Sequence, residues 1–584
     1  MVLINFFTMM LGKYSVKTNF DFIILGAGSA GCVLANRLSA NRDVEVCLIE
    51  AGAKDTDVRI HVPLGFAFFG DKSTLSWNYD TEPQKGFDKV PVESPATAVV
   101  DSAGGVHNVQ AELMEHRKGF QPRGKTLGGS SSINAMLYVR GHRWDYNHWS
   151  ELGNAGWSYD EILPYFKKAE HNEVFDDAFH GQNGPLNVCK TRYSNKPTDQ
   201  FVEAGSKLYA YNDDFNGAEQ EGIGYYQATQ KDGKRCSTAR AYLVPAMDRP
   251  NLTVLTDTQV NKLLLDGDKA VGVQCMTPQQ EMVDFSATKE VILSAGAFGS
   301  PQILLRSGIG PAKEITKHGI EHLVDLPGVG QNLQDHLDYL SVHKHPSSEL
   351  IGISLRSIFY TAPKELLKYI LKKTGLFTTT GAEAGGFIRT SDELDVPDVQ
   401  LHFVPAMVVD HGRTKLWGHG LSCHVCLLRP KSRGTVKLQS ADPHDDPLID
   451  PKFLSHPDDM KVLVAGYKKL MAIMNTGPIS QYIAECLRPV NINDDRDIER
   501  AIRESSDSVY HPVGTCKMGS DSDAVVDERL RVHKVKNLRV VDASVMPTLV
   551  GGNTNAPTVM IGEKAADMIV QDWQAAGKER LAGL

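Results

Sequence analysis

The stretch that decides the expected fold is DFIILGAGSAG, residues 21–31. Its apolar, partly β-branched first half predicts a buried strand, and the following CVLANRLSAN has the apolar spacing of a helix. Between the two lies the pattern GxGxxG. Gly26 would turn the chain, Gly28 would let the backbone approach a pyrophosphate, and Gly31 would let the helix pack close to the strand. The stretch therefore predicts a dinucleotide-binding turn, with the diphosphate at the helix N-terminus.

A second apolar run, VEVCLIEAG, strengthens this interpretation. It ends in Glu50 and Ala51, close to the ~20 residues downstream at which a carboxylate meets a ribose hydroxyl. An acidic residue in this place disfavours the 2′-phosphate of NADP. NAD and FAD share their adenosine half, so these residues do not choose between them, and Glu50 could also be a solvated strand end.

The composition is that of an ordinary globular protein. The chain has 584 residues, of which 41% are hydrophobic and 23% are charged, and this is enough for two or more domains. A formal charge of -9 and the absence of a basic stretch argue against nucleic-acid binding. Nine scattered cysteines do not have the spacing of a disulfide scaffold, which favours a reducing cytoplasm.

The N-terminus makes a poor signal peptide, because no basic residue precedes its apolar run and no small-residue cleavage site follows closely. No apolar stretch reaches the ~18 residues of a membrane-spanning helix. We expect a cytoplasmic protein, and peripheral attachment to the inner face of a membrane stays open.

Two further glycine-rich segments follow. Residues 123–141 read RGKTLGGSSSINAMLYVRG and could lay backbone and hydroxyl donors against a flat polar ring. Residues 289–310 read KEVILSAGAFGSPQILLRSGIG, which predicts a strand, a turn, a helix opened by Ser300-Pro301 and a stop at glycine. Taken singly, either segment predicts no more than a glycine-rich turn.

Together these segments resemble the signatures of the glucose-methanol-choline (GMC) oxidoreductases, which bind FAD. The resemblance covers nearly the whole chain, and it is carried further by PGVGQNLQDH (327–336), LRPKSRG (428–434), YHPVGTCKMG (510–519) and GGNTNAPTVMIGEKAADMI (551–569). Residues 128–149 and 374–388 look most like the bacterial alcohol and choline dehydrogenases, especially the branch that acts on aliphatic alcohols.

The resemblance implies a set of residues that hold the cofactor. In some relatives a histidine of the Gly-Gly-Ser segment binds FAD covalently, but Ile133 occupies the matching position here, so we expect non-covalent FAD. The cofactor-binding residues that we expect are Gly26, Gly28, Ser29, Ala30, Gly31, Glu50, Ala51, Gly128, Gly129, Ser130, Asn134, Val260, Asp542 and Ala543.

The resemblance also makes His511 the catalytic base, and the unperturbed pKa of imidazole, about 6.5, suits that task. Asn555 falls at the expected second active-site position, where an amide can hold the alcohol oxygen. Pro557 is suited to a first helical turn, and Asn555 stands where an N-cap would. The helix that follows would point its positive end at the flavin pyrimidine edge.

Other histidines and cysteines suggest no metal site. Neither His511 nor Cys516 belongs to a tetrahedral-ligand spacing. Cys423 and Cys426 form a CxxC, but LSCHVCLLRP predicts a strand, where these positions face opposite ways, so we expect core thiols.

The expected fold class is α/β, a Rossmann-like FAD-binding domain with an interleaved α+β substrate domain on an antiparallel sheet that roofs the flavin. The FAD domain would comprise 18–160, 225–330 and 500–584, and the substrate domain 161–224 and 331–499. Residues 1–17 would form an N-terminal extension. The 85–120 insertion is longer than the family's linker, and it could be a lid, an oligomer contact or a solvated loop.

The expected reaction is the oxidation of a primary alcohol to an aldehyde, with proton abstraction by His511 and hydride transfer to flavin N5. Electrons would pass to a quinone or another non-oxygen acceptor. Choline dehydrogenase, oxygen-using oxidase, and a non-redox lyase or photodecarboxylase on the same fold are the alternatives. The partners are thus a small alcohol and an electron carrier, and the oligomeric state is open.

Overall fold

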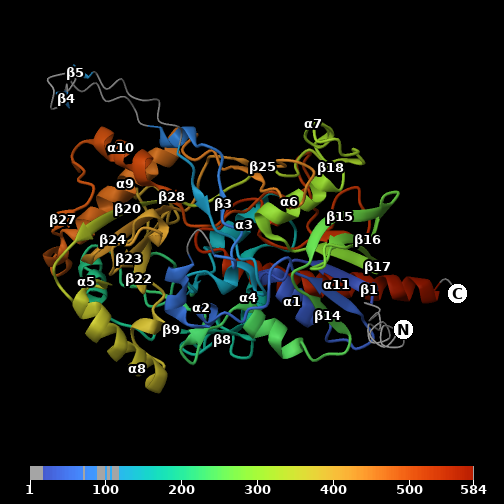
Figure 1. The fold of residues 1–584 in the computed structure, drawn as a ribbon, viewed down its shortest axis with the longest axis horizontal. Coiled ribbons are helices and arrows are strands. Elements are labelled where there is room, and N and C mark those ends of the chain that lie inside the picture. The colour runs from blue at the N-terminus through green and yellow to red at the C-terminus, as the bar shows by residue number, and fades with distance from the viewer. Residues whose placement is uncertain (1–16, 70–72, 89–98, 101–105, 108–116, 583–584) are drawn as a thin grey trace, which may run out of the picture.

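The chain forms two large β-sheets that lie side by side, each with its own helices (Figure 1). The computed structural model describes residues 17–69, 73–88, 99–100, 106–107 and 117–582. Residues 1–16 of the predicted extension (1–17) and most of the 85–120 insertion lie outside the described residues.

The first sheet has seven strands and is mostly parallel. Its centre is β1 (Asn19–Leu25), which pairs in parallel with β2 (Val46–Ile49) on one side and with β17 (Met282–Leu293) on the other. Because both faces of the sheet are covered, β1 and β2 are nearly continuous apolar runs. The remaining strands are β14 (Leu252–Leu255), β15 (Gln259–Asp266), β16 (Lys269–Met276) and β29 (Leu538–Val540).

Two helices, α1 (Ser29–Leu38) and α11 (Asn555–Ala582), cross on this sheet. They approach closely because Gly562 has no side chain: a Cβ there would lie 3.1 Å from the Cβ of Val33. α4 (Tyr159–Ala169) packs against α11, and their apolar side chains join those of the sheet in one large core.

The helix α6 (Gly296–Arg306) begins earlier than the sequence predicts. Its first turn is held by the buried Asp542 carboxylate, which accepts from the Gly296 N–H at 2.9 Å, so the helix starts before the expected Ser300-Pro301. Pro301 lies inside the helix and cannot bond to the Ala297 carbonyl one turn back. The Thr515 hydroxyl donates to that carbonyl at 2.6 Å, so this carbonyl keeps a partner.

The second sheet is the predicted antiparallel one. Its core is β22 (Ala384–Ile388), β23 (Val399–Val404), β24 (Gly418–Leu427) and β20 (Leu337–Lys344), which run in that order. β10 (Gly222–Tyr225) and β27 (Glu485–Cys486) extend the sheet, and β21 (Gly352–Ile353) and β28 (Asp507–Ser508) pair with β24 and β20. Cys423 and Cys426 of β24 are buried free thiols, as predicted.

A second core lies between this sheet and the helices α5 (Lys196–Gly205), α9 (Pro457–Met474) and α10 (Asp495–Ser505).

A smaller, four-stranded sheet contains β7 (Leu137–Tyr138), β11 (Gln227–Ala228), β9 (Leu186–Lys190) and β8 (Glu170–Asn172). Shorter helices are α2 (Val58–His61), α3 (Arg143–Glu151), α7 (Ala312–Thr316) and α8 (Ala362–Lys372). Pairs of short strands are β3 with β6 (Tyr79–Asp80, Phe120–Gln121), β4 with β5 (Val99–Val100, Val106–His107), β12 with β13 (Gln230–Lys231, Lys234–Arg235), β18 with β19 (Ile309–Gly310, Val324–Asp325) and β25 with β26 (Thr435–Lys437, Leu448–Asp450).

The chain alternates between the two large sheets, so neither is built from one continuous segment. The domain boundaries stay a prediction. β28 lies beyond the predicted limit at residue 500 and still pairs with the second sheet.

Candidate functional site

One large cavity, about 1030 Å³ in volume, is lined by residues of both sheets. Of the residues predicted from the sequence for cofactor or catalysis, all except Gly31 and Gly128 line it. The cavity therefore gathers side chains that are hundreds of residues apart in the sequence.

The first glycine turn has the three separate geometries that its pattern requires. Gly26 has φ of +102°, and a Cβ there would lie 2.5 Å from the Ser294 carbonyl oxygen. A Cβ on Gly31 would lie 1.9 Å from the Gly26 carbonyl oxygen. At Gly28 the nearest atom would be 3.8 Å away, so the backbone there is open to the cavity.

The residues at this end of the cavity fit a dinucleotide such as FAD. Helix α1 has no side chain capping its N-terminus, which leaves first-turn N–H groups for an anionic diphosphate. Glu50, beside Ala51, accepts from the backbone N–H groups of Ala27 and Gly52 at 2.8 Å each. Burial raises the pKa of Glu50 to about 7.

The second glycine segment packs on the first. The Gly128 N–H donates to the Ala27 carbonyl at 2.7 Å, and a Cβ on Gly129 would lie 2.7 Å from the Gly28 Cα. Ser130, Ile133 and Asn134 follow along the cavity wall. The Asn134 carbonyl oxygen accepts from Arg235 at 2.7 Å, which holds this wall in place.

Val260, Asp542 and Ala543 line the cavity near α6. The Asp542 carboxylate is buried and accepts from Ser300 Oγ at 2.6 Å and from the Ser544 N–H at 2.8 Å, besides Gly296. Its side chain therefore organises α6, and a ligand would meet the backbone of this segment.

Also in the cavity lining, His511 belongs to a chain of hydrogen bonds that fixes its tautomer. His336 Nε2 lies 3.1 Å from the Leu428 carbonyl oxygen, which can only accept, so Nε2 carries the proton. His336 Nδ1 is then a lone pair, and it lies 2.9 Å from His511 Nδ1. His511 Nδ1 must therefore donate, and His511 Nε2 is left unprotonated.

Both rings are neutral around pH 7. Burial lowers the pKa of His336 to about 3, and burial together with His336, Arg123 and His402 lowers that of His511 well below its usual value. The backbone N–H of His511 donates to the Asp335 carboxylate at 2.9 Å, which anchors the main chain at this residue. A neutral imidazole with an unprotonated Nε2 is the form that a general base requires.

The amide beside this base is Asn553, in place of the predicted Asn555. Asn553 Nδ2 lies 3.3 Å from His511 Nε2, and Gln400 donates to the Asn553 carbonyl oxygen at 3.2 Å, which fixes its orientation. Asn555 lines the same cavity, but its side chain accepts from Ser29 Oγ at 2.7 Å. Helix α11 begins at Asn555, so that residue meets the start of α1 while Asn553 precedes the helix.

The second sheet supplies cavity residues that sequence reasoning missed. Its register sets His402, His424 and Leu340 side by side on three neighbouring strands, all lining the cavity. His424 Nδ1 lies 2.6 Å from Asp338. The motif PGVGQNLQDH contains His336, but nothing local in it signals contact with a residue 175 positions away.

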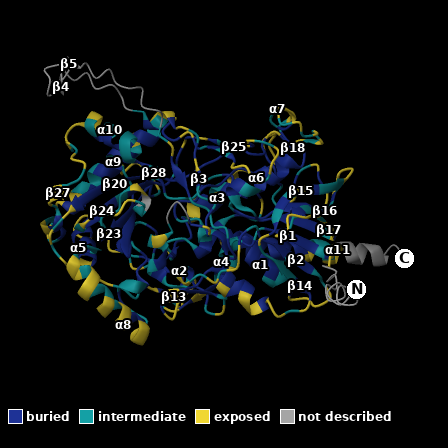
Figure 2. Cartoon of the chain, viewed as in Figure 1, coloured by how far each residue is buried: buried dark blue, intermediate teal, exposed yellow. Residues whose placement is uncertain are grey.

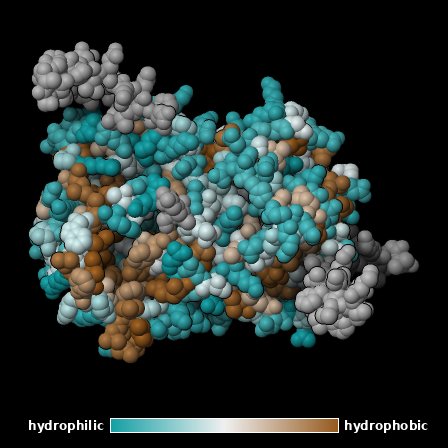
Figure 3. Space-filling model, in the orientation of Figure 1, coloured by the Kyte–Doolittle hydropathy of each residue, from teal (hydrophilic) through white to brown (hydrophobic). Residues whose placement is uncertain are grey.

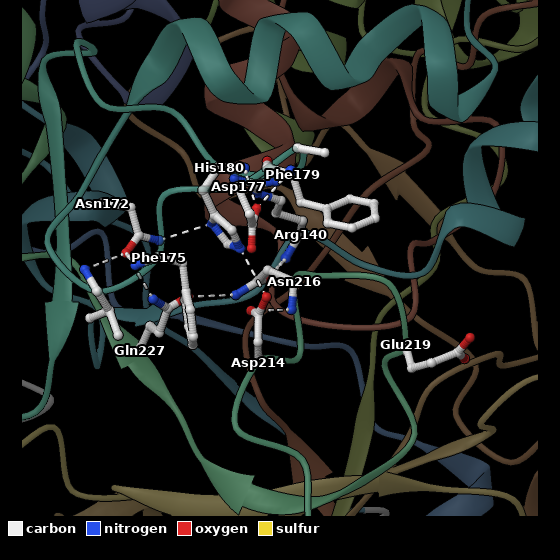
Figure 4. Close-up of polar contacts among 12 residues, drawn as sticks. Arg140, Asn172, Phe175, Asp177, Phe179, His180, Asp214, Asn216, Glu219 and Gln227 are labelled. Carbon is white, nitrogen blue, oxygen red and sulfur yellow. Dashed lines mark hydrogen bonds and ion pairs between the residues drawn. The ribbon is translucent and has the colours of Figure 1, made fainter.

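A separate polar cluster lies around His180 (Figure 4). His180, Asp177 and Asp214 offer atoms within 4.8 Å of one another, an arrangement that metals use. However, His180 Nε2 lies 2.9 Å from Asp214 and Nδ1 lies 3.3 Å from Glu170, which itself pairs with the buried Arg140. Burial opposes protonation, but these two carboxylates raise the pKa of His180 to about 9. Both ring nitrogens of His180 already have polar partners, and Nδ1 also lies 3.0 Å from Asn172 Nδ2, so we interpret this cluster as a hydrogen-bonded ion-pair network.

The fold and the cavity together define a dinucleotide-binding protein of the α/β class. Residues 20–338 and 430–562 match the N- and C-terminal profiles of the GMC oxidoreductases. The chain belongs to this family, whose members depend on FAD.

Similar proteins span almost the entire chain. The alcohol dehydrogenase [acceptor] of Pseudomonas putida is 44% identical over 97% of this chain and 98% of its own length. The mitochondrial choline dehydrogenase of Homo sapiens is 40% identical over 95% and 90% of the two chains. Among solved structures, pyridoxine 4-oxidase from Mesorbium loti superposes with a TM-score of 0.80 at 30% identity, over 94% of this chain and 99% of that one.

Proposed function

We propose that the protein oxidises a primary aliphatic alcohol to the aldehyde, with His511 as the base. The observation that carries this proposal is the hydrogen-bond chain from the Leu428 carbonyl through His336, which leaves His511 Nε2 free to accept a proton. FAD, when bound, supplies the acceptor for the hydrogen and electron pair that leave the carbinol carbon. Gly26, Gly28, Glu50 and the N-terminus of α1 would hold its adenosine and diphosphate.

Asn553 takes the role that we first expected of Asn555. Its amide N–H group and His511 Nε2 lie close enough to share one hydroxyl oxygen between them. Asn553 would hold that oxygen while His511 removes the proton, and Gln400 keeps the amide turned the right way. Asn555, bonded to Ser29, would act on the cofactor side.

The lining of the cavity favours an aliphatic substrate. Apolar side chains come from η1 (Pro63–Phe68), from the strand β21 and from the segment after β23, and they include Leu64, Phe66, Ile353, Met407 and Val409. A cationic alcohol such as choline would meet the positive charge of Arg123, which helps to lower the pKa of His511. The similarity to an alcohol dehydrogenase that uses an acceptor supports a quinone or another non-oxygen carrier as the electron acceptor. Since Ile133 stands in the glycine segment, the FAD would be bound non-covalently.

An anaerobic visible spectrum of the holoprotein in the dark tests the proposal. Addition of a medium-chain primary alcohol should bleach the flavin band, and choline should bleach it far more slowly. Precipitation with acid should then release the flavin, because it is not covalently bound. A flavin that stays oxidised with every alcohol while a product forms would favour a lyase, and product formation only under blue light would favour a photodecarboxylase. We expect a quinone analogue to reoxidise the reduced flavin rapidly, and air to reoxidise it slowly.

A further inference from the structure

The segment from Leu355 to Lys373 displays an unusual amount of apolar surface. It comprises the short π-helix η6 (Ser357–Thr361) and helix α8, which projects from the part of the molecule that holds the second sheet (Figures 1 and 2). The patch is the brown area over α8 in Figure 3. Its large apolar side chains are 43% to 76% exposed, and we call them the α8 surface: Leu355, Ile358, Phe359, Tyr360, Leu366, Leu367, Ile370 and Leu371.

The helix is anchored to the protein by its opposite side. Tyr369 is buried and its ring lies 5.9 Å from that of Phe377. The Glu365 carboxylate accepts from the Leu376 N–H at 2.9 Å. The fold therefore holds α8 with its apolar residues outward, in contrast to the usual inward orientation of such a helix.

Basic residues flank the apolar ones. Lys364, Lys368 and Lys372 are spaced four residues apart and so form one row along α8, next to the pairs Leu367–Leu371 and Leu366–Ile370. From Leu355 to Lys373 the chain has five basic residues and one acidic residue, whereas the whole chain carries -9. This positive, apolar strip stands out against a negative protein.

The α8 surface also lies next to residues that line the cavity. Residues 351–353, just before it, and Leu376, just after it, line the cavity. Phe68, which also lines the cavity, is 59% exposed, and Trp417, bridged to Ile353, is 60% exposed. The apolar strip thus continues towards the cavity lining.

We propose that the α8 surface docks on an anionic lipid bilayer, with its apolar side chains in the interface and its lysines on the headgroups. An apolar face beside a row of lysines is what an interfacial helix presents to such a membrane. A second copy of this chain fits less well, because it would bring two positive strips together. Within the residues that the structure describes, no helix is long and apolar enough to cross a bilayer. Docking would bring this part of the cavity lining next to the membrane, from which apolar substrates and carriers could enter.

Flotation of the full-length holoprotein with vesicles tests this proposal. The protein should float with vesicles of phosphatidylcholine and phosphatidylglycerol, and less with phosphatidylcholine alone or in high salt. The variant Phe359→Ser/Leu367→Ser/Leu371→Ser should bind about tenfold more weakly or worse. A matched control, Leu152→Ser/Leu208→Ser/Met282→Ser, removes apolar groups that are 47% to 49% exposed elsewhere and should bind like wild type.

The variant Lys364→Gln/Lys368→Gln/Lys372→Gln should lose the preference for anionic vesicles and keep its weak binding to neutral ones. Failure of the wild type to float with any vesicle would overturn the proposal, as would equal weakening in the matched control. Light scattering without lipid gives a further check: a wild-type dimer that the first variant turns into a monomer, without vesicle binding, would assign the surface to self-association. Alcohol-driven flavin bleaching of the same variants without vesicles should match wild type, so this test is independent of the proposed reaction.

Discussion

The most informative perturbation is the substitution of His336, which we expect to act on His511 without touching the substrate. His336 is fully buried, and its Nδ1 is the acceptor that keeps the proton on His511 Nδ1. In His336→Phe that acceptor is lost, and the ring Nδ1–H of His511 is left buried without a partner. Leaving such a group unsatisfied costs about 1–3 kcal/mol. The His511 tautomer with a free Nε2 is destabilised by the same amount.

One factor of ten corresponds to about 1.4 kcal/mol, so the base-competent tautomer should fall by about 5- to 150-fold. The rate of flavin reduction by saturating alcohol, followed anaerobically by stopped flow, should fall by that factor. His336→Asn is the matched control, because its side-chain oxygen can accept from His511 Nδ1 near the place of the lost ring nitrogen. It should recover most of the rate, and both variants should retain FAD.

Reduction at the wild-type rate in a His336→Phe variant that retains FAD would refute the tautomer argument. The same conclusion would follow if His336→Asn were as slow as His336→Phe, because the effect would then come from packing around the ring.

Three further outcomes are expected. Asn553→Ala should slow flavin reduction about 10²-fold and retain FAD. Asn555→Ala should chiefly weaken FAD retention, measured as flavin content after gel filtration. The reverse pattern would return the substrate-holding role to Asn555. Because the pKa of His511 is lowered, kcat/KM should stay level well below pH 6.5, and an acid limb centred near 6.5 would contradict its environment. The folded-state pKa of His180 is raised to about 9, so the stability that its protonation contributes is complete below pH 6.5 and disappears as the pH rises through 9. His180→Gln should therefore lower the free energy of unfolding by about 1–3 kcal/mol at pH 6 and by much less at pH 10. Denaturant titration at the two pH values measures this difference.

Much of the fold could be predicted because its signals are local. The run from Asp21 to Gly31 predicts a strand, a turn and the start of a helix within one continuous stretch, and the structure has β1 and α1 there. The β-rich segments around β23 and β24 likewise predicted an antiparallel sheet, since alternation and β-branching are properties of neighbouring residues. Helix α6 was misjudged at its start because Asp542, which holds its first turn, lies 246 residues away.

The candidate base could be named from its motif, but its protonation state could not. The bond between His336 and His511 joins two loops that are far apart in the chain, and only their packing between the sheets decides which nitrogen is free. The choice between Asn553 and Asn555 has the same origin. The two residues differ by two positions in the sequence, and the direction in which each side chain points depends on where α11 begins.

The sequence by itself determined the dinucleotide turn and the family, and it predicted the histidine, because each of these signals lies in contiguous residues. The tertiary structure alone decided the partners of that histidine and the orientation of α8. The apolar and basic spacing of residues 362–372 would suit a helix packed against the core equally well. Only the anchoring of Tyr369 and Glu365 on the inner side turns those apolar residues to the outside, because the free energy of burying one face depends on what the rest of the chain places against it.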